Sequence, residues 1–327
     1  MSDRSLPESV LSIRDLSVHY GTDRGELNAL RHVNLDVPKG SIVGVVGESG
    51  CGKSTLISSI IRLLSENAHI PNGSIEFEGK NLLDFSEDQM RDIRGDRMSI
   101  VFQDPMSTLN PVMSIGKQMM DIQYRDKKTT AEKRQRSIDM LASVGIPDPE
   151  SRLKQYPHEF SGGMQQRISI AMALQAQPSL LIADEPTTAL DATLEVQIIH
   201  LLKALQVDMG CSILFISHHL GVIAELCDHV IVMYAGEVIE QGAVRDVFHR
   251  PAHPYTEKLL QCDPASISKK TRSLPTIPGE IPDLVSLPPG CVFKNRCDKA
   301  IARCDKEVPA WMEAGNAHYV SCHLNGS

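Results

Sequence analysis

The stretch SIVGVVGESGCGKSTL, residues 41–56, decides the fold of this chain. Its first part, 41–46, is a continuous apolar run, which is typical of a strand buried on both faces of a sheet. A glycine-rich turn follows. After the turn, apolar residues recur at helical spacing at Leu56, Ile57, Ile60, Ile61 and Leu64. The stretch therefore predicts a strand–loop–helix unit.

The turn itself matches a phosphate-binding loop. Residues 47–54 fit the pattern G-x-x-x-x-G-K-S/T, and they lie after a strand and before a helix, as the pattern requires. Glycines let backbone N–H groups converge on phosphate oxygens, and the positive end of the helix faces the anion. We expect Lys53 to reach the β- and γ-phosphates and Ser54 to ligate Mg²⁺. The expected nucleotide-binding residues are Gly47, Glu48, Ser49, Gly50, Cys51, Gly52, Lys53, Ser54 and Thr55.

A second buried strand, expected over 180–184, ends in two adjacent carboxylates, Asp184 and Glu185. A carboxylate at the C-terminal end of a strand can face a site across the top of the sheet. Asp184 suits Mg²⁺, reached through water, and Glu185 suits polarisation of the attacking water. Alone, the two would be interpreted as a surface acidic pair. Downstream of a phosphate loop we interpret them as catalytic.

The third element is Ser161-Gly162-Gly163, followed by Met164. Ser161 is a candidate helix N-cap, and the glycines leave backbone N–H groups open. In chain order the motifs are the phosphate loop, Ser-Gly-Gly and the strand that ends in Asp184 and Glu185. As this ordered set, they resemble the ABC ATPase family over most of residues 10–250. The resemblance makes Ser-Gly-Gly the signature sequence, with Met164 where glutamine is most common. It implies that Ser161 and Gly163 contact ATP held by an opposite subunit in a dimer.

The same resemblance implies roles for four further residues. Gln103, which ends a strand expected at 98–102, corresponds to the glutamine that approaches Mg²⁺ and water. Asp191 belongs to the loop at the dimer seam, with Ala189 and Leu190. His218 corresponds to the histidine that holds the γ-phosphate, and Tyr20 to the aromatic ring that stacks on adenine. Residue 219 departs from the family pattern, because it is histidine where many members have aspartate.

Composition limits the function classes. The chain has 327 residues and a formal net charge of −8, from 33 Lys and Arg against 41 Asp and Glu. That charge argues against affinity for DNA or RNA by phosphate neutralisation, so no nucleic-acid partner is expected. The polar N-terminus lacks the apolar core of a signal peptide. The longest apolar runs, such as 211–218, are too short for a membrane helix, so a membrane role requires a partner.

These patterns predict an α/β fold of the ABC type. An antiparallel β subdomain is expected around 10–20 and 29–37, where apolar and polar residues alternate. Strands and helices alternate over 180–236, which predicts a mainly parallel sheet covered by helices. Between the two, 104–178 forms a helical insert. We assign 1–262 to the nucleotide-binding domain.

The last part of the chain, 263–327, differs in composition. Its linker, 264–290, excludes regular helix or central strand because it contains Pro264, Pro275, Pro278, Pro282, Pro288 and Pro289. The small irregular module that follows carries Cys291, Cys297, Cys304 and Cys322. The His-Pro-Tyr-Thr segment at 253–256 and this cysteine tail resemble the ATP-binding subunits of dipeptide and oligopeptide permeases, over nearly the full length.

The four tail cysteines predict a metal or cluster site. Thiolates hold iron–sulfur clusters and structural Zn²⁺, whereas disulfides are unusual in a cytoplasmic chain. The spacings lack the C-x2-C pairs of zinc ribbons. The resemblance favours a [4Fe–4S] cluster, with Zn²⁺ as the alternative. A structural staple and redox control of transport both remain open as its role.

The expected function is ATP hydrolysis that energises import of dipeptides or oligopeptides. By the resemblance, the chain lies peripherally at the cytoplasmic face of the inner membrane. Its partners are two membrane-spanning permease subunits, a second and different ATPase subunit, and indirectly a solute-binding protein. The segment 104–125 is the expected docking surface. Alternatives are an importer for nickel or another small solute, a soluble ABC ATPase of translation or DNA repair, and an iron–sulfur electron carrier.

Overall fold

The computed structural model describes residues 8–188, 190–263, 275–315 and 317–325. Contacts divide the chain into two units, one formed by 1–84 with 215–327 and the other by 85–214. The domain boundary predicted between 262 and 263 stays a prediction. In the described part of the chain, no helix has both the length and the apolar character needed to cross a membrane.

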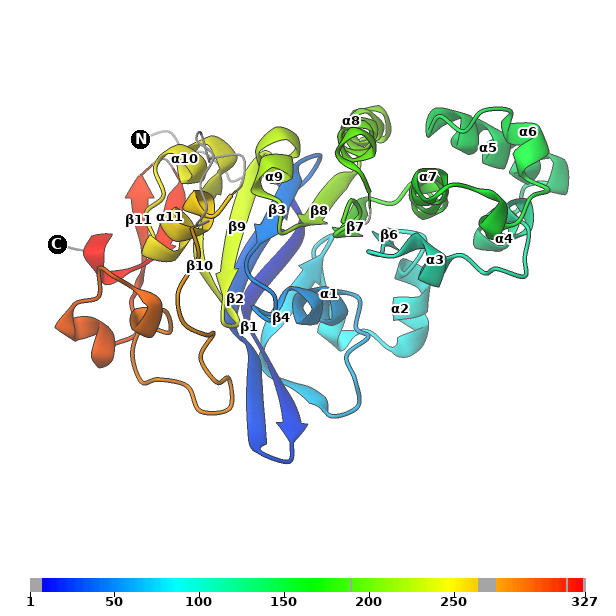
Figure 1. Ribbon diagram of the computed structural model, residues 1–327. Coiled ribbons are helices and arrows are strands. Elements are labelled where there is room, and N and C mark those ends of the chain that lie inside the picture. Colours follow the sequence, from blue (N-terminus) through cyan, green and yellow to red (C-terminus); the bar gives the residue numbers. More distant parts are fainter. Residues whose placement is uncertain (1–7, 189, 264–274, 316, 326–327) are drawn as a thin grey trace, which may run out of the picture. The chain divides into compact units, whose positions relative to one another are not determined.

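The first unit begins with a four-stranded antiparallel sheet in the order β2-β1-β4-β5 (Figure 1). Its strands are β1 (Ser9–Thr22), β2 (Gly25–Pro38), β4 (Ala68–Phe77) and β5 (Lys80–Asn81). The alternation predicted in 29–37 is present, because Val33, Leu35 and Val37 are buried on one face of β2. The antiparallel subdomain is therefore confirmed.

A second sheet in this unit contains the strand that leads into the phosphate loop. In spatial order its strands are β11 (Trp311–Gly315), β12 (His318–Ser321), β10 (Glu237–Ala243), β9 (His229–Tyr234) and β3 (Ile42–Val46). β3 is parallel to β9, and every residue of β3 is buried, as its apolar run predicts. The helices are α1 (Lys53–Ile60), α9 (Leu220–Leu226), α10 (Val244–His249) and α11 (Pro254–Gln261).

The second unit contains the strands β6 (Met98–Val101) and β7 (Leu180–Asp184), which pair in parallel. Its helices are α2 (Glu87–Ile93), α3 (Pro105–Thr108), α4 (Ile115–Ile122), α5 (Thr130–Ser143), α6 (Pro149–Arg152), α7 (Gly162–Leu174) and α8 (Ala192–Met209). The helices α3 to α7 lie within 104–178, where the sequence predicts a helical insert. The strand β8 (Ser212–Ile216) lies where the sequence passes from this unit back to the first.

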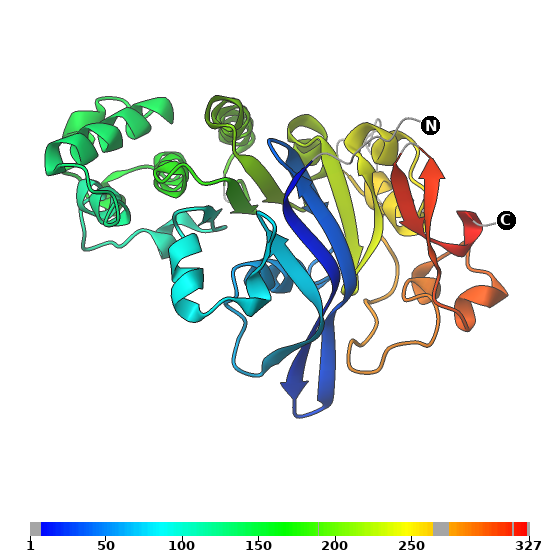
Figure 2. The same ribbon diagram turned by 180° about the vertical axis from the view of Figure 1, so that it is seen from behind.

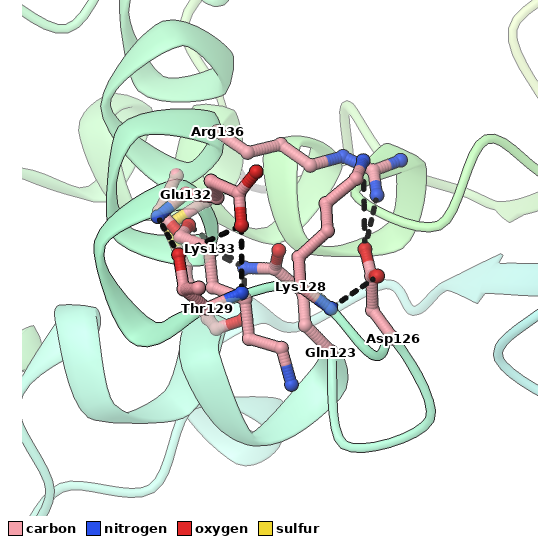
Figure 3. A network of polar contacts seen from close by, with 9 residues as sticks. Gln123, Asp126, Lys128, Thr129, Glu132, Lys133 and Arg136 are labelled. Atoms are coloured by element: carbon pink, nitrogen blue, oxygen red, sulfur yellow. Dashed lines mark hydrogen bonds and ion pairs between the residues drawn. The ribbon is translucent and has the colours of Figure 1, made fainter.

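A polar network fixes the connection between α4 and α5 (Figure 3). The buried amide of Gln123 donates to Ser137 Oγ at 3.0 Å and to the carbonyl oxygen of Lys133 at 3.1 Å. Thr129 caps α5 and exchanges hydrogen bonds with Glu132 in a capping box. These bonds satisfy the end of α5 and hold the loop that follows α4.

The C-terminal part of the chain is less irregular than predicted. β11 and β12 form a hairpin that continues the second sheet beside β10, and Figure 2 shows it in red. The prediction of a small irregular module was therefore wrong for this hairpin. Strands this short carry a weak local signal, and β12 forms because Val320 is fully buried where it pairs with Glu240. The proline-rich residues 275–290 contain neither helix nor strand, as expected.

Buried polar residues join α11 and β12 to β10. The fully buried Glu240 accepts hydrogen bonds from the backbone N–H groups of Ala252 and His253, and it pairs with His318 Nε2 at 2.6 Å. His253 is 2% exposed, and its Nδ1 accepts the N–H of Tyr255 at 2.9 Å as the cap of α11. Burial lowers the pKa of His253 from 6.5 to about 3. This imidazole is therefore neutral in the folded protein.

We predict that His253 makes the folded state sensitive to acid. The unfolded chain binds the proton more readily than the folded chain between pH 6.5 and about 3, so the free energy of unfolding falls as pH drops through this range. The slope from this one group is about 1.4 kcal/mol per pH unit. His253→Asn keeps an acceptor for the Tyr255 N–H and removes the titration. Denaturant unfolding of both proteins from pH 7 to 5 measures the difference, and parallel curves would contradict the prediction.

Candidate nucleotide site

The phosphate loop depends on two glycines that other parts of the chain approach closely. A Cβ at Gly47 would collide with the carbonyl oxygen of Met233 in β9. Gly52 has φ 106°, and a Cβ there would lie 2.9 Å from the carbonyl oxygen of Ala29 in β2. Only glycine fits both the conformation and the space. Strands β2 and β9 therefore set the path of the loop.

Lys53 opens helix α1 and folds back over the loop. Its Nζ donates to the carbonyl oxygens of Gly47 at 2.6 Å and Glu48 at 3.1 Å. Gly52 caps α1 without a side-chain hydrogen bond, which leaves the first backbone N–H groups of the helix suited to an anion. Among the predicted loop residues, Cys51 and Lys53 are buried, Glu48, Gly52 and Thr55 are half-buried, and Ser49, Gly50 and Ser54 are exposed. This arrangement fits a phosphate chain with an accessible Ser54 for Mg²⁺.

Two other predicted residues belong to the same unit as the loop. Tyr20 is half-buried on β1, opposite Leu27 of β2 and Ala68 of β4. His218 is exposed after β8, and its ring packs edge-on against His219 with centroids 4.5 Å apart. Both histidines are accessible, so the choice of His218 over His219 stays a prediction.

The second unit brings two predicted catalytic residues together. Asp184 ends β7 and is half-buried, and Glu185 follows it with φ 46°, a left-handed conformation that is rare outside glycine. Glu185 Oε2 accepts hydrogen bonds from Gln103 Nε2 at 3.2 Å and from Thr188 Oγ1 at 3.0 Å. Because β6 and β7 are parallel neighbours, the residues that follow them meet at one edge. Strain held in this way is typical of functional sites.

The Ser-Gly-Gly motif lies where α7 begins. Ser161 caps the helix, and its Oγ accepts the N–H of Met164 at 3.4 Å. Gly162 is exposed, and a Cβ there would meet open space. Gly163 is buried, and a Cβ there would lie 2.9 Å from Leu194 Cδ1 of α8. The exposed cap and open glycine leave the start of α7 accessible.

Asp191 caps the neighbouring helix α8. Its Oδ1 accepts the N–H groups of Thr193 and Leu194, both at 3.0 Å. Leu190, half-buried, precedes it, whereas Ala189 lies outside the described residues. The cap shows a structural role for Asp191. Its position at a dimer seam stays a prediction.

Two residues that hold the phosphate loop were not predicted. The hydroxyl of Tyr255 accepts the backbone N–H of Glu48 at 3.0 Å, and Arg296 forms a bidentate ion pair with the Glu48 carboxylate. Hydrogen bonding to Glu48 raises the pKa of Arg296 above its usual value. The available signals were the His-Pro-Tyr-Thr segment and the position of Arg296 directly before Cys297.

The four tail cysteines gather in the first unit. The N–H of Cys291 donates to the carbonyl oxygen of Cys304 at 2.9 Å. Burial, with smaller contributions from the other three thiols, raises the pKa of Cys291 to about 11. In the described residues, no three of these sulfurs lie within 4.8 Å of one another.

Fold and site together define an ABC-type ATPase. The ABC transporter family model matches residues 30–188. A second model, for the C-terminal region of oligopeptide and dipeptide transporters, matches residues 239–304, which include Tyr255 and Arg296.

Individual relatives show which branch of the ABC ATPases the chain belongs to. The dipeptide transport ATP-binding protein DppD of Bacillus subtilis is 46% identical over 97% of this chain and 95% of its own length. The oligopeptide transport ATP-binding protein OppD of the same species is 44% identical over 96% and 88%. DppD of Escherichia coli is 42% identical over 96% of each chain. The chain belongs to this family of dipeptide and oligopeptide ABC transporter ATP-binding proteins.

Solved structures confirm the cassette fold. A dimeric ATP-binding cassette in a post-hydrolysis state, bound to ADP and Pi, matches with a TM-score of 0.64 and 28% identity over 72% of this chain and 99% of that one. The protein cbiO1 of Clostridium perfringens, part of an ABC transporter complex, matches with a TM-score of 0.65 and 30% identity over 74% and 92%.

We predict that Glu185→Gln lowers ATP turnover by about 10²- to 10⁴-fold, because an amide cannot take a proton from water. ATP affinity should change little, since the phosphate loop is untouched. Phosphate release by the assembled transporter measures turnover. Glu150→Gln, which removes an exposed carboxylate paired with Arg134, is the matched control and should retain activity. Near-normal turnover of Glu185→Gln would exclude it as the general base.

Proposed function

We propose that this chain hydrolyses ATP to energise the import of dipeptides or oligopeptides by a membrane ABC transporter. The observation that carries this proposal is the near full-length likeness to dipeptide and oligopeptide transport ATP-binding proteins. The likeness includes both the cassette and the C-terminal region, which a generic ABC ATPase lacks. The transported peptide is selected by partner proteins.

Within the cassette, each site residue has a proposed role. Bound ATP with Mg²⁺ supplies the phosphoryl group and the metal that neutralises its developing charge. The loop N–H groups and Lys53 would hold the phosphates, and Ser54, Asp184 and Gln103 would hold the metal. Glu185 takes the proton of the attacking water, and its bonds from Gln103 and Thr188 orient the carboxylate.

The complete site is proposed to need a second ATPase subunit, in a mixed dimer. Ser161 and Gly163 at the start of α7 would contact ATP held by that subunit, with Asp191 at the seam. On the side of the phosphate loop, His218 would hold the γ-phosphate and Tyr20 would stack on adenine. The exposure of Ser161, Asp191 and His218 supports this arrangement, because residues that meet a partner must be accessible.

The permease subunits are proposed to dock on the segment 104–125. Large apolar side chains are exposed along it, namely Met106 (69%), Val112 (80%) and Tyr124 (65%). A groove of about 500 Å³ lies beside Tyr124 and is lined by residues of the α4–α5 connection, including Gln123 and Asp126. Such a run of exposed apolar residues marks a protein interface. The chain would then be a peripheral subunit of the inner membrane, on its cytoplasmic face.

The tail cysteines are proposed to hold a [4Fe–4S] cluster. Each iron of such a cluster binds its own thiolate, so the four sulfurs lie further apart than around one metal ion. Cys297, Cys304 and Cys322 lie close enough to Cys291 to help raise its pKa, which supports a shared metal group. The lack of C-x2-C pairs supports the cluster over Zn²⁺. The cluster would staple a module that has little apolar core of its own.

We predict that Met106→Asp disrupts docking, because it places a charge in the apolar surface that faces the permease. ATP hydrolysis stimulated by the permease should fall about tenfold or more, a loss of about 1.4 kcal/mol or more in coupling. Val207→Asp on α8 is the matched control, since Val207 is 70% exposed against 69% for Met106. Co-purification with the permease subunits measures docking. Equal behaviour of the two variants would contradict the proposed surface.

We predict that protein purified without oxygen contains about four irons and four acid-labile sulfides per chain. Cys291→Ser should lower the iron content and the sulfide content. Cys211→Ser should lower neither content, because Cys211 is a buried cysteine directly before β8 and outside the tail. Iron and sulfide analysis measures the content. Stoichiometric zinc without sulfide would contradict the cluster and support the alternative ion.

A further inference from the structure

The cysteine module reaches the phosphate loop through one buried arginine. Arg296 ends the short helix η4 (Lys294–Arg296) and directly precedes Cys297. Its Nη1 and Nη2 donate to the two carboxylate oxygens of Glu48 at 2.7 and 3.0 Å. The side chain of Arg296 is 4% exposed and that of Glu48 is 28% exposed. Such a bidentate pair fixes both distance and orientation.

The same arginine is fixed on its other side. Its Nε donates to the carbonyl oxygen of Pro278 at 2.9 Å, and Nη2 donates to that of Ile277 at 3.1 Å. Nη1 also lies 3.3 Å from the hydroxyl of Tyr234. Arg296 is therefore bonded to the linker, to β9 and to the phosphate loop. These bonds join the C-terminal part of the chain to the loop through one side chain.

Glu48 is also held by its backbone. Its N–H donates to the hydroxyl of Tyr255, whose ring packs with those of Tyr234 and Phe293 at centroid distances of 4.7 and 5.4 Å. The carbonyl oxygen of Glu48 accepts from Lys53 Nζ at 3.1 Å. A shift of Glu48 would therefore move a hydrogen-bond acceptor of the lysine that serves the phosphates.

The ion pair also controls charge at the loop. Glu48 directly follows Gly47, so its carboxylate lies on the loop that takes a polyanion. Paired with Arg296, this carboxylate is neutralised. Unpaired, it would repel the phosphates of ATP across a partly desolvated surface.

We propose that Arg296 is a positioning residue for the phosphate loop, which neutralises and fixes Glu48 so that the cysteine module sets the affinity of the chain for ATP. This inference rests on the proposed function, since it takes ATP as the ligand of the loop. Arg296 touches neither the nucleotide nor the reacting atoms in this proposal. It acts through Glu48.

The test compares single and double variants of the full-length chain by equilibrium displacement of a fluorescent ATP analogue with ATP. Arg296→Gln leaves Glu48 unpaired and should weaken ATP binding by about tenfold. The double variant Glu48→Gln/Arg296→Gln removes both charges and should bind ATP at least threefold more tightly than Arg296→Gln alone, because loss of both partners costs less than loss of one. Arg296→Lys keeps the positive charge but cannot form the bidentate pair, so its ATP affinity should lie between those of wild type and Arg296→Gln.

The matched control is Arg303→Gln in the same module, where Arg303 pairs with Glu307 at the surface with both side chains more than half exposed. Its ATP affinity should match wild type, because surface pairs contribute little. Wild-type affinity in Arg296→Gln would overturn the inference, and so would a double variant as weak as the single one. Failure of the wild type itself to bind ATP would overturn the proposed function instead.

Discussion

The structure depends on the sharp turn that residues 47–53 make between β3 and α1. Gly47 passes against the carbonyl oxygen of Met233 and Gly52 against that of Ala29, so strands from two sheets fix the backbone of the loop. Lys53 closes the turn with bonds to Gly47 and Glu48. A rigid loop of this kind presents its N–H groups without reorganisation when phosphate binds, which is how a protein binds an anion strongly without a net positive charge.

The second constraint is the strained conformation of Glu185. A non-glycine residue at φ 46° is costly, and the surrounding bonds must hold it. Gln103 and Thr188 supply those bonds from the end of β6 and from the loop after β7. This conformation directs a carboxylate away from the end of a buried strand, and that carboxylate is the proposed general base. The phosphate loop and the Glu185 carboxylate are thus positioned in the same way, each by a sharp turn at the end of a buried strand.

Much of this site could be predicted from the sequence, because its signals are local. The phosphate loop, the strand ending in Asp184 and the cap at Ser161 are each contained within a few neighbouring residues. The contact between Arg296 and Glu48 could not be predicted, because 248 residues separate the two and no local pattern pairs a residue of the cysteine module with one of the phosphate loop. The hairpin β11–β12 was missed for a similar reason, since it forms through pairing with β10. The structure also does not decide which of His218 and His219 holds the γ-phosphate, because both side chains are exposed.

In the proposed function, ATP hydrolysis at this loop energises peptide import. Uptake of a labelled dipeptide into vesicles that contain the assembled transporter tests it most directly, with the peptide-loaded binding protein outside and nucleotide inside. The account predicts uptake with ATP, none with a non-hydrolysable analogue, and none when Lys53→Ala replaces the wild-type chain. Uptake that persists with the analogue or the variant would contradict it.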